Sequence, residues 1–404
     1  MNFSNLKIIN AKIITPNQII DQGSILVMNG KITAITGGHI ENNEVPVIDA
    51  AGKYVSPGFI DIHVHGGGGH DFMDNTLDSF LEIARLHARH GTTSFTPTTL
   101  SCEKDELLKT LRLYEEADAL NINGSQFIGL HIEGPYFSMN QRGAQDPRYI
   151  RLPDPVEYKE VLKQSSIVKR WSAAPELKGA IAFGKFLKSK GILPSIAHTD
   201  AVYEDVVKAF ENGYTHVTHL YSAMSGVTRR NAFRFAGVIE SAFLLDDMTV
   251  EIIADGIHLP PPLLKLVYKI KGPDKIALIT DAMRAAGMPS GESILGGLDN
   301  GLKVIVEDDV AKLPDRSAFA GSVATADRLV RNMIRLAEVP LTDAIKMITS
   351  TPAIIMGVAD KKGSLVVGKD ADIVVFDQDI NIKYTIIGGK VVHASNVADI
   401  SYIN

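Results

Sequence analysis

The chain has 404 residues, of which 45% are hydrophobic and 22% charged, ordinary values for a protein with a large buried core. Its formal net charge of −6 argues against nucleic acid or an anionic membrane as a partner, because both require a basic surface. Cys102 is the only cysteine, which excludes an internal disulfide and favours a reducing, cytoplasmic location. We expect neither a secretory signal nor a membrane span of roughly 20 apolar residues.

Both ends of the chain are rich in short β-type runs. In the N-terminal part these runs lie at 6–9, 12–15, 24–28 and 31–35, and Asn29-Gly30 is a hairpin turn signal. Similar runs return at 371–376, 382–387 and 390–393. We therefore predict one small β-sandwich domain built from residues 1–56 and 358–404.

The middle of the chain alternates apolar β-runs with segments of helical periodicity. The β-runs lie near 59–65, 93–98, 126–133, 168–174, 192–198, 215–220, 249–254 and 276–281. Helical periodicity is found in the intervening segments 76–90, 104–119, 180–190, 203–212 and 262–271. Eight parallel strands that alternate with helices close a barrel. The sequence therefore predicts an α/β fold, a (β/α)₈ TIM-like barrel over residues 57–357.

Two histidines end the first barrel strand. His63 and His65 are two residues apart, so in a strand they project from the same face, and glycines follow them from Gly66 to Gly69. Such a pair can bind a divalent metal. For an isolated His-x-His, a pair of hydrogen-bonded core histidines is the better interpretation, so the rest of the chain decides.

Further polar residues end other predicted strands. They are Glu133, His198, His219 and Asp281. Active sites of such barrels lie at the carboxyl ends of the strands, so we expect these residues to converge with His63 and His65. Imidazole and carboxylate ligands suit Zn, Fe, Mn or Co as divalent ions, with no choice among them. A metal that activates water, with Asp281 as the proton shuttle, predicts hydrolysis of a carbonyl-type bond such as an amide.

Several motifs together resemble a known family. They are PGFIDIHVHG from Pro57, GLHIEGPYF from Gly129, IAHTDA from Ile196, VTHLYSAM from Val217, IADGIHL from Ile253, LITDAM from Leu278 and AGS from Ala320. This set is similar to the N-acetylglucosamine-6-phosphate deacetylases of the amidohydrolase superfamily. Many amidohydrolases carry a carboxylated lysine on the fourth strand. The segment Arg170–Pro175 offers no lysine, and Glu133 can fill that bridging role instead.

The resemblance implies roles for the polar residues. Glu133, His198 and His219 match the principal metal site, His63 and His65 match the ligands of a second ion, and Asp281 matches the catalytic aspartate. Whether one or two ions bind stays open.

The resemblance also indicates a substrate-binding set: Gln145, Ser222, Ala223, Arg230, Arg234 and His258. His258 resembles a histidine that reaches the substrate phosphate of the neighbouring subunit, which implies a homodimer. An ordinary loop histidine is the alternative for this residue.

This substrate-binding set departs from the family pattern. Gln145 stands where the family usually has His, and Ser222 where it usually has Asn. Arg-Glu-Pro-Gly becomes Arg234-Phe235-Ala236-Gly237, preceded by extra residues that include Arg229 and Arg230. Three arginines within six positions can hold a phosphate, although a solvated arginine pair is an equal alternative.

These observations predict a metal-dependent hydrolase of amino-sugar catabolism. It would release acetate from N-acetylglucosamine 6-phosphate and leave glucosamine 6-phosphate. The alternatives are the same reaction on N-acetylgalactosamine 6-phosphate or another N-acyl substrate, and an inactive amidohydrolase scaffold that serves as an interaction protein. Loss of metal ligands is typical of such scaffolds, whereas every expected ligand is present here.

Overall fold

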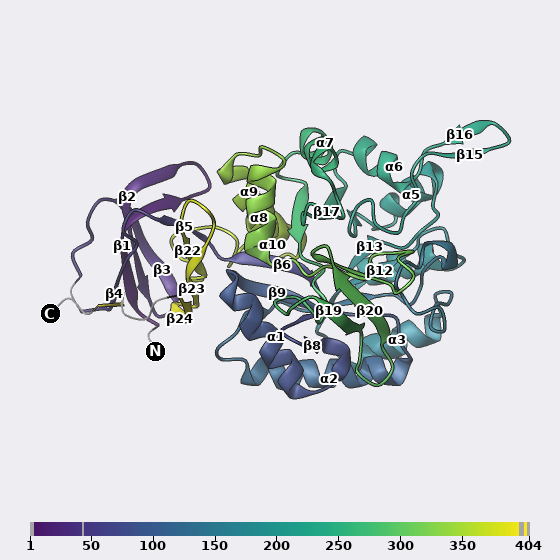
Figure 1. Ribbon diagram of the computed structural model, residues 1–404, viewed down its shortest axis with the longest axis horizontal. Helices are drawn as coiled ribbons and strands as arrows, with labels where there is room; N and C mark the ends of the chain where they lie inside the picture. Colours follow the sequence, from purple (N-terminus) through teal and green to yellow (C-terminus); the bar gives the residue numbers. More distant parts are fainter. Residues whose placement is uncertain (1–3, 43, 396–399, 402–404) are drawn as a thin grey trace.

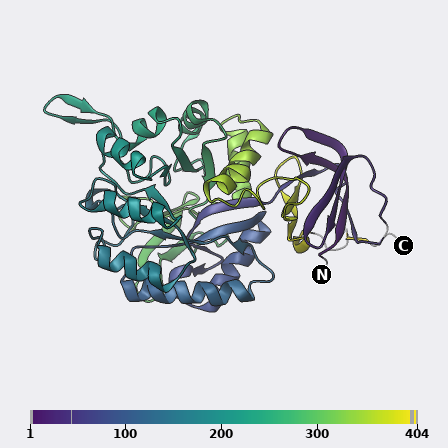
Figure 2. The same ribbon diagram turned by 180° about the vertical axis from the view of Figure 1, so that it is seen from behind.

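The computed structural model describes residues 4–42, 44–395 and 400–401. The chain forms a barrel surrounded by helices and, beside it, a smaller β-rich unit (Figures 1 and 2). Segments from both ends of the chain make up the smaller unit, as the sequence predicts. The domain boundaries at 56/57 and 357/358 stay a prediction, and the ends of the predicted ranges lie outside the described residues.

Eight parallel strands form the barrel, and this confirms the predicted fold class. They are β6 (Phe59–Val64), β9 (Thr92–Thr99), β11 (Leu130–Glu133), β12 (Val168–Ala173), β13 (Leu193–Ile196), β14 (His216–Val217), β17 (Thr249–Ile253) and β18 (Ile276–Ile279). A short strand, β10 (Gln126–Phe127), also pairs with β9. An isolated parallel bridge between Val64 and Ala282 joins the first strand to the segment after the last.

Helices pack around this barrel (Figure 1). They are α1 (Leu77–Arg89), α2 (Lys104–Leu120), α3 (Pro155–Gln164), α4 (Ala180–Ser189), α5 (Tyr203–Glu211), α6 (Val238–Leu244), α7 (Pro261–Lys271), α8 (Ala326–Arg335), α9 (Leu341–Ile348) and α10 (Ser350–Ile355). The short elements η1 (Phe72–Asp74), η2 (Met139–Gln141), β7 (Gly66–Gly67) and β8 (His70–Asp71) lie in the loops. The five helical segments expected from periodicity are all confirmed, within one residue or so at each end.

Helix α1 shows how local sequence sets these elements. The Thr76 side chain accepts a hydrogen bond from the Ser79 N–H, which caps the amino end of the helix. Ile83 and Ala84 follow Phe80 by three and four residues, so all three lie on one face of the helix. All three are buried. The helix therefore covers the barrel with an apolar stripe and exposes its polar face.

The smaller unit is a sheet of nine strands among the described residues. Its strands are β1 (Leu6–Ile14), β2 (Ile19–Met28), β3 (Lys31–Gly37), β4 (Val47–Asp49), β5 (Tyr54–Pro57), β22 (Ile373–Phe376), β23 (Ile382–Ile387), β24 (Lys390–Ala394) and β25 (Ile400–Ser401). The antiparallel pairing of β5 with β22 joins the two chain ends. Buried side chains such as Ile13, Val55 and Val375 form one hydrophobic core within it.

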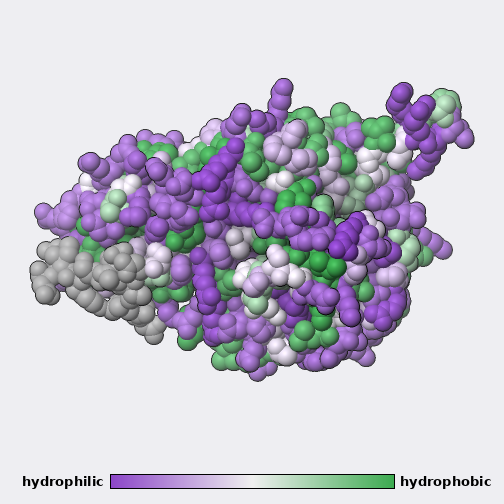
Figure 3. Space-filling view, viewed as in Figure 1, coloured by the Kyte–Doolittle hydropathy of each residue, from purple (hydrophilic) through white to green (hydrophobic). Residues whose placement is uncertain are grey.

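Two excursions from the barrel were not predicted. The first is a hairpin arm of β15 (Thr228–Arg230) and β16 (Phe233–Phe235), which projects from the body in Figures 1 and 2. Its turn residues Asn231 and Ala232 both have positive φ, 49° and 70°, as a two-residue type I′ turn requires. Figure 3 shows its surface, at the upper right, as mostly hydrophilic.

The second excursion is a small antiparallel sheet after the last barrel strand. It consists of β19 (Gly291–Leu295), β20 (Leu302–Glu307) and β21 (Val310–Lys312). Leu295, Val304 and Ala320 pack with Met283 in a separate hydrophobic cluster. Because Met283 follows the barrel strand β18 closely, this sheet lies beside the carboxyl ends of the strands.

The interior of the barrel is unusually polar. Inward-facing positions of this fold are mostly Val, Ile and Leu. Here the fully buried residues include His131, Arg170, Ser172, His216 and Glu251. Their hydrogen bonds with one another satisfy groups that would be costly to bury alone. Among the described residues no helix is long and apolar enough to cross a membrane.

Candidate metal centre

The six chemically active residues predicted from strand ends meet at one rim of the barrel. His63 lies within β6 and Glu133 ends β11, while the others follow their strands by one or two residues: His65, His198, His219 and Asp281. Each of the six is at most 8% exposed. The carboxyl ends of parallel strands therefore bring together residues that are far apart in the sequence.

Sharp backbone turns aim three of these side chains into the rim. The φ angles of His198, His219 and Asp281 are 46°, 28° and 48°, in the left-handed region that side chains with a Cβ rarely adopt. Each residue comes directly after its strand leaves the barrel. Such strained positions persist only where the surroundings impose them, and they cluster at functional sites.

The side-chain atoms form two triads that share Glu133. Its Oε1 lies 2.9 Å from His219 Nε2 and 3.4 Å from His198 Nε2. On the other side, His63 Nε2 is 3.5 Å from Glu133 Oε1, and His65 Nε2 is 3.4 Å from Oε2. Within each triad the potential ligand atoms lie within 4.8 Å of one another, a spacing at which each could hold a metal ion.

The charges of this cluster require a cation. Burial by itself lowers the pKa of His63, but the charges of Glu133 and Glu251 outweigh it and raise that pKa to about 9. For His65 burial is likewise outweighed, by hydrogen bonds to Asp281 and Glu133, and its pKa rises to about 10. Burial raises the pKa of Glu133 and Asp281, yet the histidines lower both below their usual range. Without a metal, protons on the imidazoles must balance these carboxylates.

The donor set fits a divalent transition metal. His63 Nε2 and His65 Nε2 lie 3.1 Å apart, so once both nitrogens have lost their protons their lone pairs can be directed at one ion. Imidazole nitrogens with carboxylate oxygens are ligands that Zn, Fe, Mn and Co share. The two triads can therefore hold a divalent ion, and the shared Glu133 can bridge two.

A cavity of about 400 Å³ opens onto the cluster. Of the substrate-binding residues expected from the sequence, those that line it are Gln145, Ser222, Ala223 and His258. Arg230 and Arg234 do not line it, because both lie on the projecting arm. His258 Nδ1 lies 2.7 Å from Asp255 Oδ2 of the same chain, so the ring is held at this chain's own cavity.

Gln145 is engaged at both ends of its amide. Its Nε2 donates to Glu133 Oε2 at 2.8 Å, and its Oε1 accepts from the Ser101 N–H at 2.9 Å. The side chain is 4% exposed. Gln145 therefore orients Glu133, which both triads share, as well as lining the cavity.

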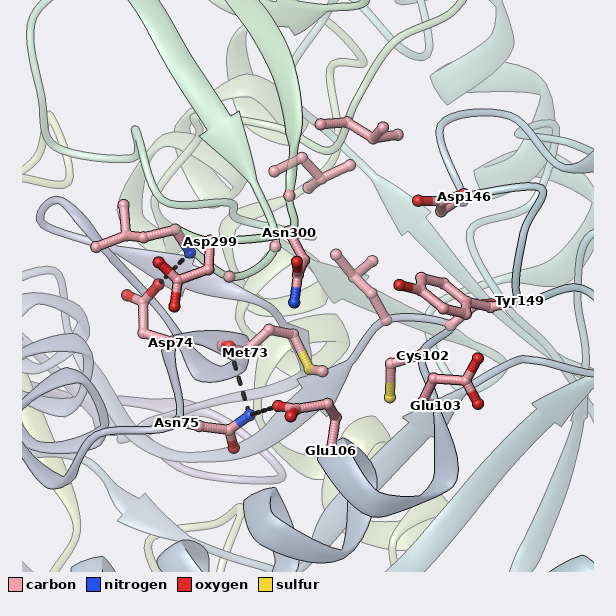
Figure 4. A pocket seen from close by; sticks show the side chains of 18 of the residues that line it. Met73, Asp74, Asn75, Cys102, Glu103, Glu106, Asp146, Tyr149, Asp299 and Asn300 are labelled. Carbon is pink, nitrogen blue, oxygen red and sulfur yellow. Dashed lines mark hydrogen bonds between the residues drawn. The ribbon is translucent and has the colours of Figure 1, made fainter.

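A second cavity of about 530 Å³ lies next to the first and is drawn in Figure 4. Leu100, Ala144, Gln145 and Leu295 line both cavities. Figure 4 shows several carboxylates around the second cavity, with Asn75 donating to Glu106 Oε2 at 3.0 Å. The four shared residues separate the second cavity from the candidate metal centre.

Sequence reasoning missed several residues at this site. Glu251 and Arg170 lie directly beneath the ligands and contact each other at 2.6 Å. The charge of Glu251 within an otherwise apolar run, Thr249–Ile253, was a signal that could have identified it. Leu295 and Phe319 also line the cavity, but their positions depend on the additional sheet and carried no local signal.

The sequence matches the amidohydrolase family over residues 54–392. The chain belongs to the amidohydrolase family. A protein of Bacillus subtilis named N-acetylglucosamine-6-phosphate deacetylase is 34% identical to this amidohydrolase over 400 residues, 98% of this chain and 99% of the relative. A protein of Escherichia coli O157:H7 named N-acetylgalactosamine-6-phosphate deacetylase is 31% identical over 380 residues, 94% of this chain and 97% of that one.

Solved structures agree with this assignment. The structure of an N-acetyl-D-glucosamine-6-phosphate deacetylase mutant from Mycobacterium smegmatis, in complex with N-acetyl-D-glucosamine 6-phosphate, is 29% identical with a TM-score of 0.88. The match covers 96% of this chain and 100% of the M. smegmatis chain. The deacetylase of Pasteurella multocida is 28% identical with a TM-score of 0.89, over 97% of this amidohydrolase and 100% of that chain. The family resemblance expected from the motifs is confirmed.

Metal binding to this amidohydrolase should release protons. In the metal-free protein the pKa values of His63 and His65 are raised from 6.5 to about 9 and 10, so both imidazoles are protonated at neutral pH. An incoming ion must displace those protons, so its affinity should rise with pH between about 6.5 and 10. Calorimetric titration of the metal-free protein with Zn²⁺, in buffers of different protonation enthalpy, measures the release. Affinity that is independent of pH, with no proton release, would contradict this prediction.

Proposed function

We propose that this amidohydrolase is a metal-dependent deacetylase of N-acetylglucosamine 6-phosphate, which yields glucosamine 6-phosphate and acetate in amino-sugar catabolism. The observation that carries the proposal is the meeting of four histidines, Glu133 and Asp281 in one cluster at the barrel rim, in a chain 34% identical to a B. subtilis deacetylase over 400 residues. The proposal includes the cytoplasmic location expected from the lone cysteine.

Asp281 is the proton carrier of the proposed reaction. Its Oδ1 lies 3.2 Å from His65 Nε2 and 3.5 Å from His63 Nε2, and these histidines keep its pKa below the ordinary value. The carboxylate is therefore ionised and can take a proton from water as the water oxygen adds to the acetyl carbonyl carbon. It then returns that proton to the sugar nitrogen as the C–N bond breaks. Water and amide are thus converted to amine and acetate with no other reactant.

The ligands would be Glu133, His198 and His219 for one ion and His63, His65 and Glu133 for a second. A divalent ion bound there supplies Lewis acidity and lowers the pKa of water to about 7. Gln145 holds Glu133, and the burial of the cluster keeps competing water out.

The substrate phosphate needs a basic partner that the cavity itself lacks. Among the described residues that line the cavity there is no lysine or arginine, and His258 is the one lining histidine outside the metal cluster. On the arm, Arg229 lies directly opposite Arg234 in the strand register. Like charges opposite each other are destabilising unless an anion lies between them. We propose that the chain forms a homodimer in which arm arginines of one copy serve the phosphate site of the other.

The galacto epimer is the second candidate substrate. One observation favours it: the E. coli O157:H7 relative, 31% identical, is named for N-acetylgalactosamine 6-phosphate. The two sugars differ only in the orientation of one hydroxyl group. Ser222 and Gln145, which depart from the residue types usual in the family, both line the cavity.

Acetate release tests the proposed function. Purified protein with measured metal content is given N-acetylglucosamine 6-phosphate, its galacto epimer and unphosphorylated N-acetylglucosamine in parallel. We expect the highest kcat/KM with the first sugar. Faster turnover of the galacto epimer would establish the second candidate, and turnover independent of the phosphate would contradict the phosphate site.

Replacing the proton carrier should abolish most of the activity. An Asp281→Asn variant keeps the size of the side chain but cannot accept the proton, so kcat should fall by about two to four orders of magnitude. Metal content and thermal stability, measured on the same preparations, should change little by comparison. Activity near that of the native protein would remove Asp281 from the mechanism.

Neutralising the arm should affect phosphate recognition and leave the chemistry intact. An Arg230→Gln/Arg234→Gln variant should raise KM for the phosphorylated sugar by about tenfold or more, since a hydrogen bond to a charged group contributes about 1.5–3 kcal/mol. The kcat value should change less, because neither arginine lies near the reacting atoms. Light scattering after gel filtration gives the oligomeric state. A monomeric native protein, or an unchanged KM, would contradict the proposed role of the arm.

A further inference from the structure

A buried carboxylate lies beneath the metal ligands without belonging to them. Glu251 projects from β17 into the barrel, and its side chain is fully buried, as is that of Arg170 from β12. The two groups are 2.6 Å apart. A buried ion pair of this kind contributes little net stability compared with apolar residues of similar size. Its contacts must therefore explain what it does.

The two oxygens of Glu251 have separate partners. Oε2 accepts from Arg170 Nη1 at 2.6 Å and lies 3.3 Å from His216 Nε2. Oε1 lies 2.7 Å from Nδ1 of His63 and accepts from the backbone N–H of His219 at 3.1 Å. One oxygen thus contacts a ligand residue from each of the two triads.

Arg170 holds this carboxylate in place. Its Nε donates to Ser195 Oγ at 2.9 Å, and its Nη2 donates to Thr218 Oγ1 at 2.8 Å. Its Nη1 also donates to the Ile62 carbonyl oxygen at 3.1 Å. These donors tie the guanidinium to β6, to β13 and to the residue directly after β14, so the Glu251 carboxylate has one orientation.

The consequence for His63 follows from donor and acceptor chemistry. An ionised carboxylate can only accept hydrogen bonds, so Nδ1 of His63 must carry the proton that it donates to Glu251. In the neutral ring the lone pair is then on Nε2, the atom that faces His65 and Glu133. Carboxylates that hold the second nitrogen of a ligating histidine fix its tautomer and orientation in this way.

We propose that Glu251, held by Arg170, is a positioning residue that prepares His63 to bind an ion with His65 and Glu133. This inference rests on the proposed metal-dependent function. According to this proposal, binding of the ion at His63 depends on the Arg170–Glu251 pair inside the barrel as well as on the ligands themselves. The triad of Glu133, His198 and His219 depends on Glu251 only through the backbone N–H of His219.

A Glu251→Gln variant tests this assignment. Arg170 cannot accept a hydrogen bond, so the amide oxygen of the glutamine must face the guanidinium and its NH₂ must face His63. The NH₂ group would then require Nδ1 of His63 to accept, which moves the ring proton to Nε2. The nitrogen that should bind the ion would become a donor.

The measurement is uptake of Co²⁺ by metal-free protein, followed by elemental analysis and visible absorption. We expect the native chain to bind two ions and the Glu251→Gln variant to bind the second ion about 10- to 100-fold more weakly. Glu157→Gln is the matched control, because Glu157 also pairs with an arginine, Arg151, and its other partner is Tyr136, which is not one of the candidate ligands. This control should bind both ions as the native chain does.

A double variant separates positioning from stability. Glu251→Gln leaves the buried Arg170 unpaired and should lower the unfolding temperature of the metal-free protein. In Arg170→Met/Glu251→Leu both charges are replaced by apolar groups, which should restore much of that stability. Binding of the second ion should stay weak in the double variant, because Nδ1 of His63 still lacks its hydrogen-bond acceptor. A purely structural role predicts that ion binding recovers together with stability.

The outcomes distinguish this inference from the proposed function. A native chain that binds no ion contradicts the metal-dependent function itself. A native chain that binds one ion, or a Glu251→Gln variant that binds two ions with native affinity, overturns the role assigned to Glu251 and leaves the deacetylase proposal standing. Recovery of native two-ion binding in the double variant would also overturn it.

Discussion

Closure of the parallel barrel is the constraint on which the rest of this structure depends. The Asp281 N–H donates to the His63 carbonyl at 3.0 Å, and the His65 N–H donates to the Ala282 carbonyl at 2.9 Å. These two hydrogen bonds join segments more than 200 residues apart in the sequence. Since all eight strands are parallel, closure also places every carboxyl end at the same rim. The polar residues that follow the strands then have no other place to lie.

The rim concentrates negative charge and imidazole in a space from which water is largely excluded. Glu133 and Asp281 are buried and ionised, and this state is tolerable only because cations lie within about 3.5 Å, either protonated histidines or metal. The left-handed backbone at His198, His219 and Asp281 has a conformational cost, and the surrounding strands hold the backbone in this conformation despite it. Both groups of described residues that could hold a metal lie at this rim, where strain, buried charge and an open cavity coincide.

A second level of organisation supports these ligands from within the barrel. Arg170 and Glu251 occupy the interior where other barrels of this fold carry aliphatic side chains. Gln145 acts from the opposite side, through Glu133. The candidate ligands are therefore held both from below and from the loops, while the additional sheet and the arm leave the barrel after its strands have ended. Such excursions can change without disturbing the strands that carry the candidate metal centre.

The sequence by itself determined which residues face the same way and how many strands there are. His63 and His65 share a face because side chains alternate along a strand, and eight apolar runs with helices between them indicate a closed barrel, both consequences of local periodicity. The sequence also identified all six residues of the rim, since each lies at or just after the end of a recognisable strand. Only the tertiary structure decided that Arg170 meets Glu251 beneath His63, that Gln145 reaches Glu133, and that Arg229 lies opposite Arg234. These contacts depend on strand register and on loops that leave the barrel and return, and no local pattern encodes the distance between elements that are remote in the chain.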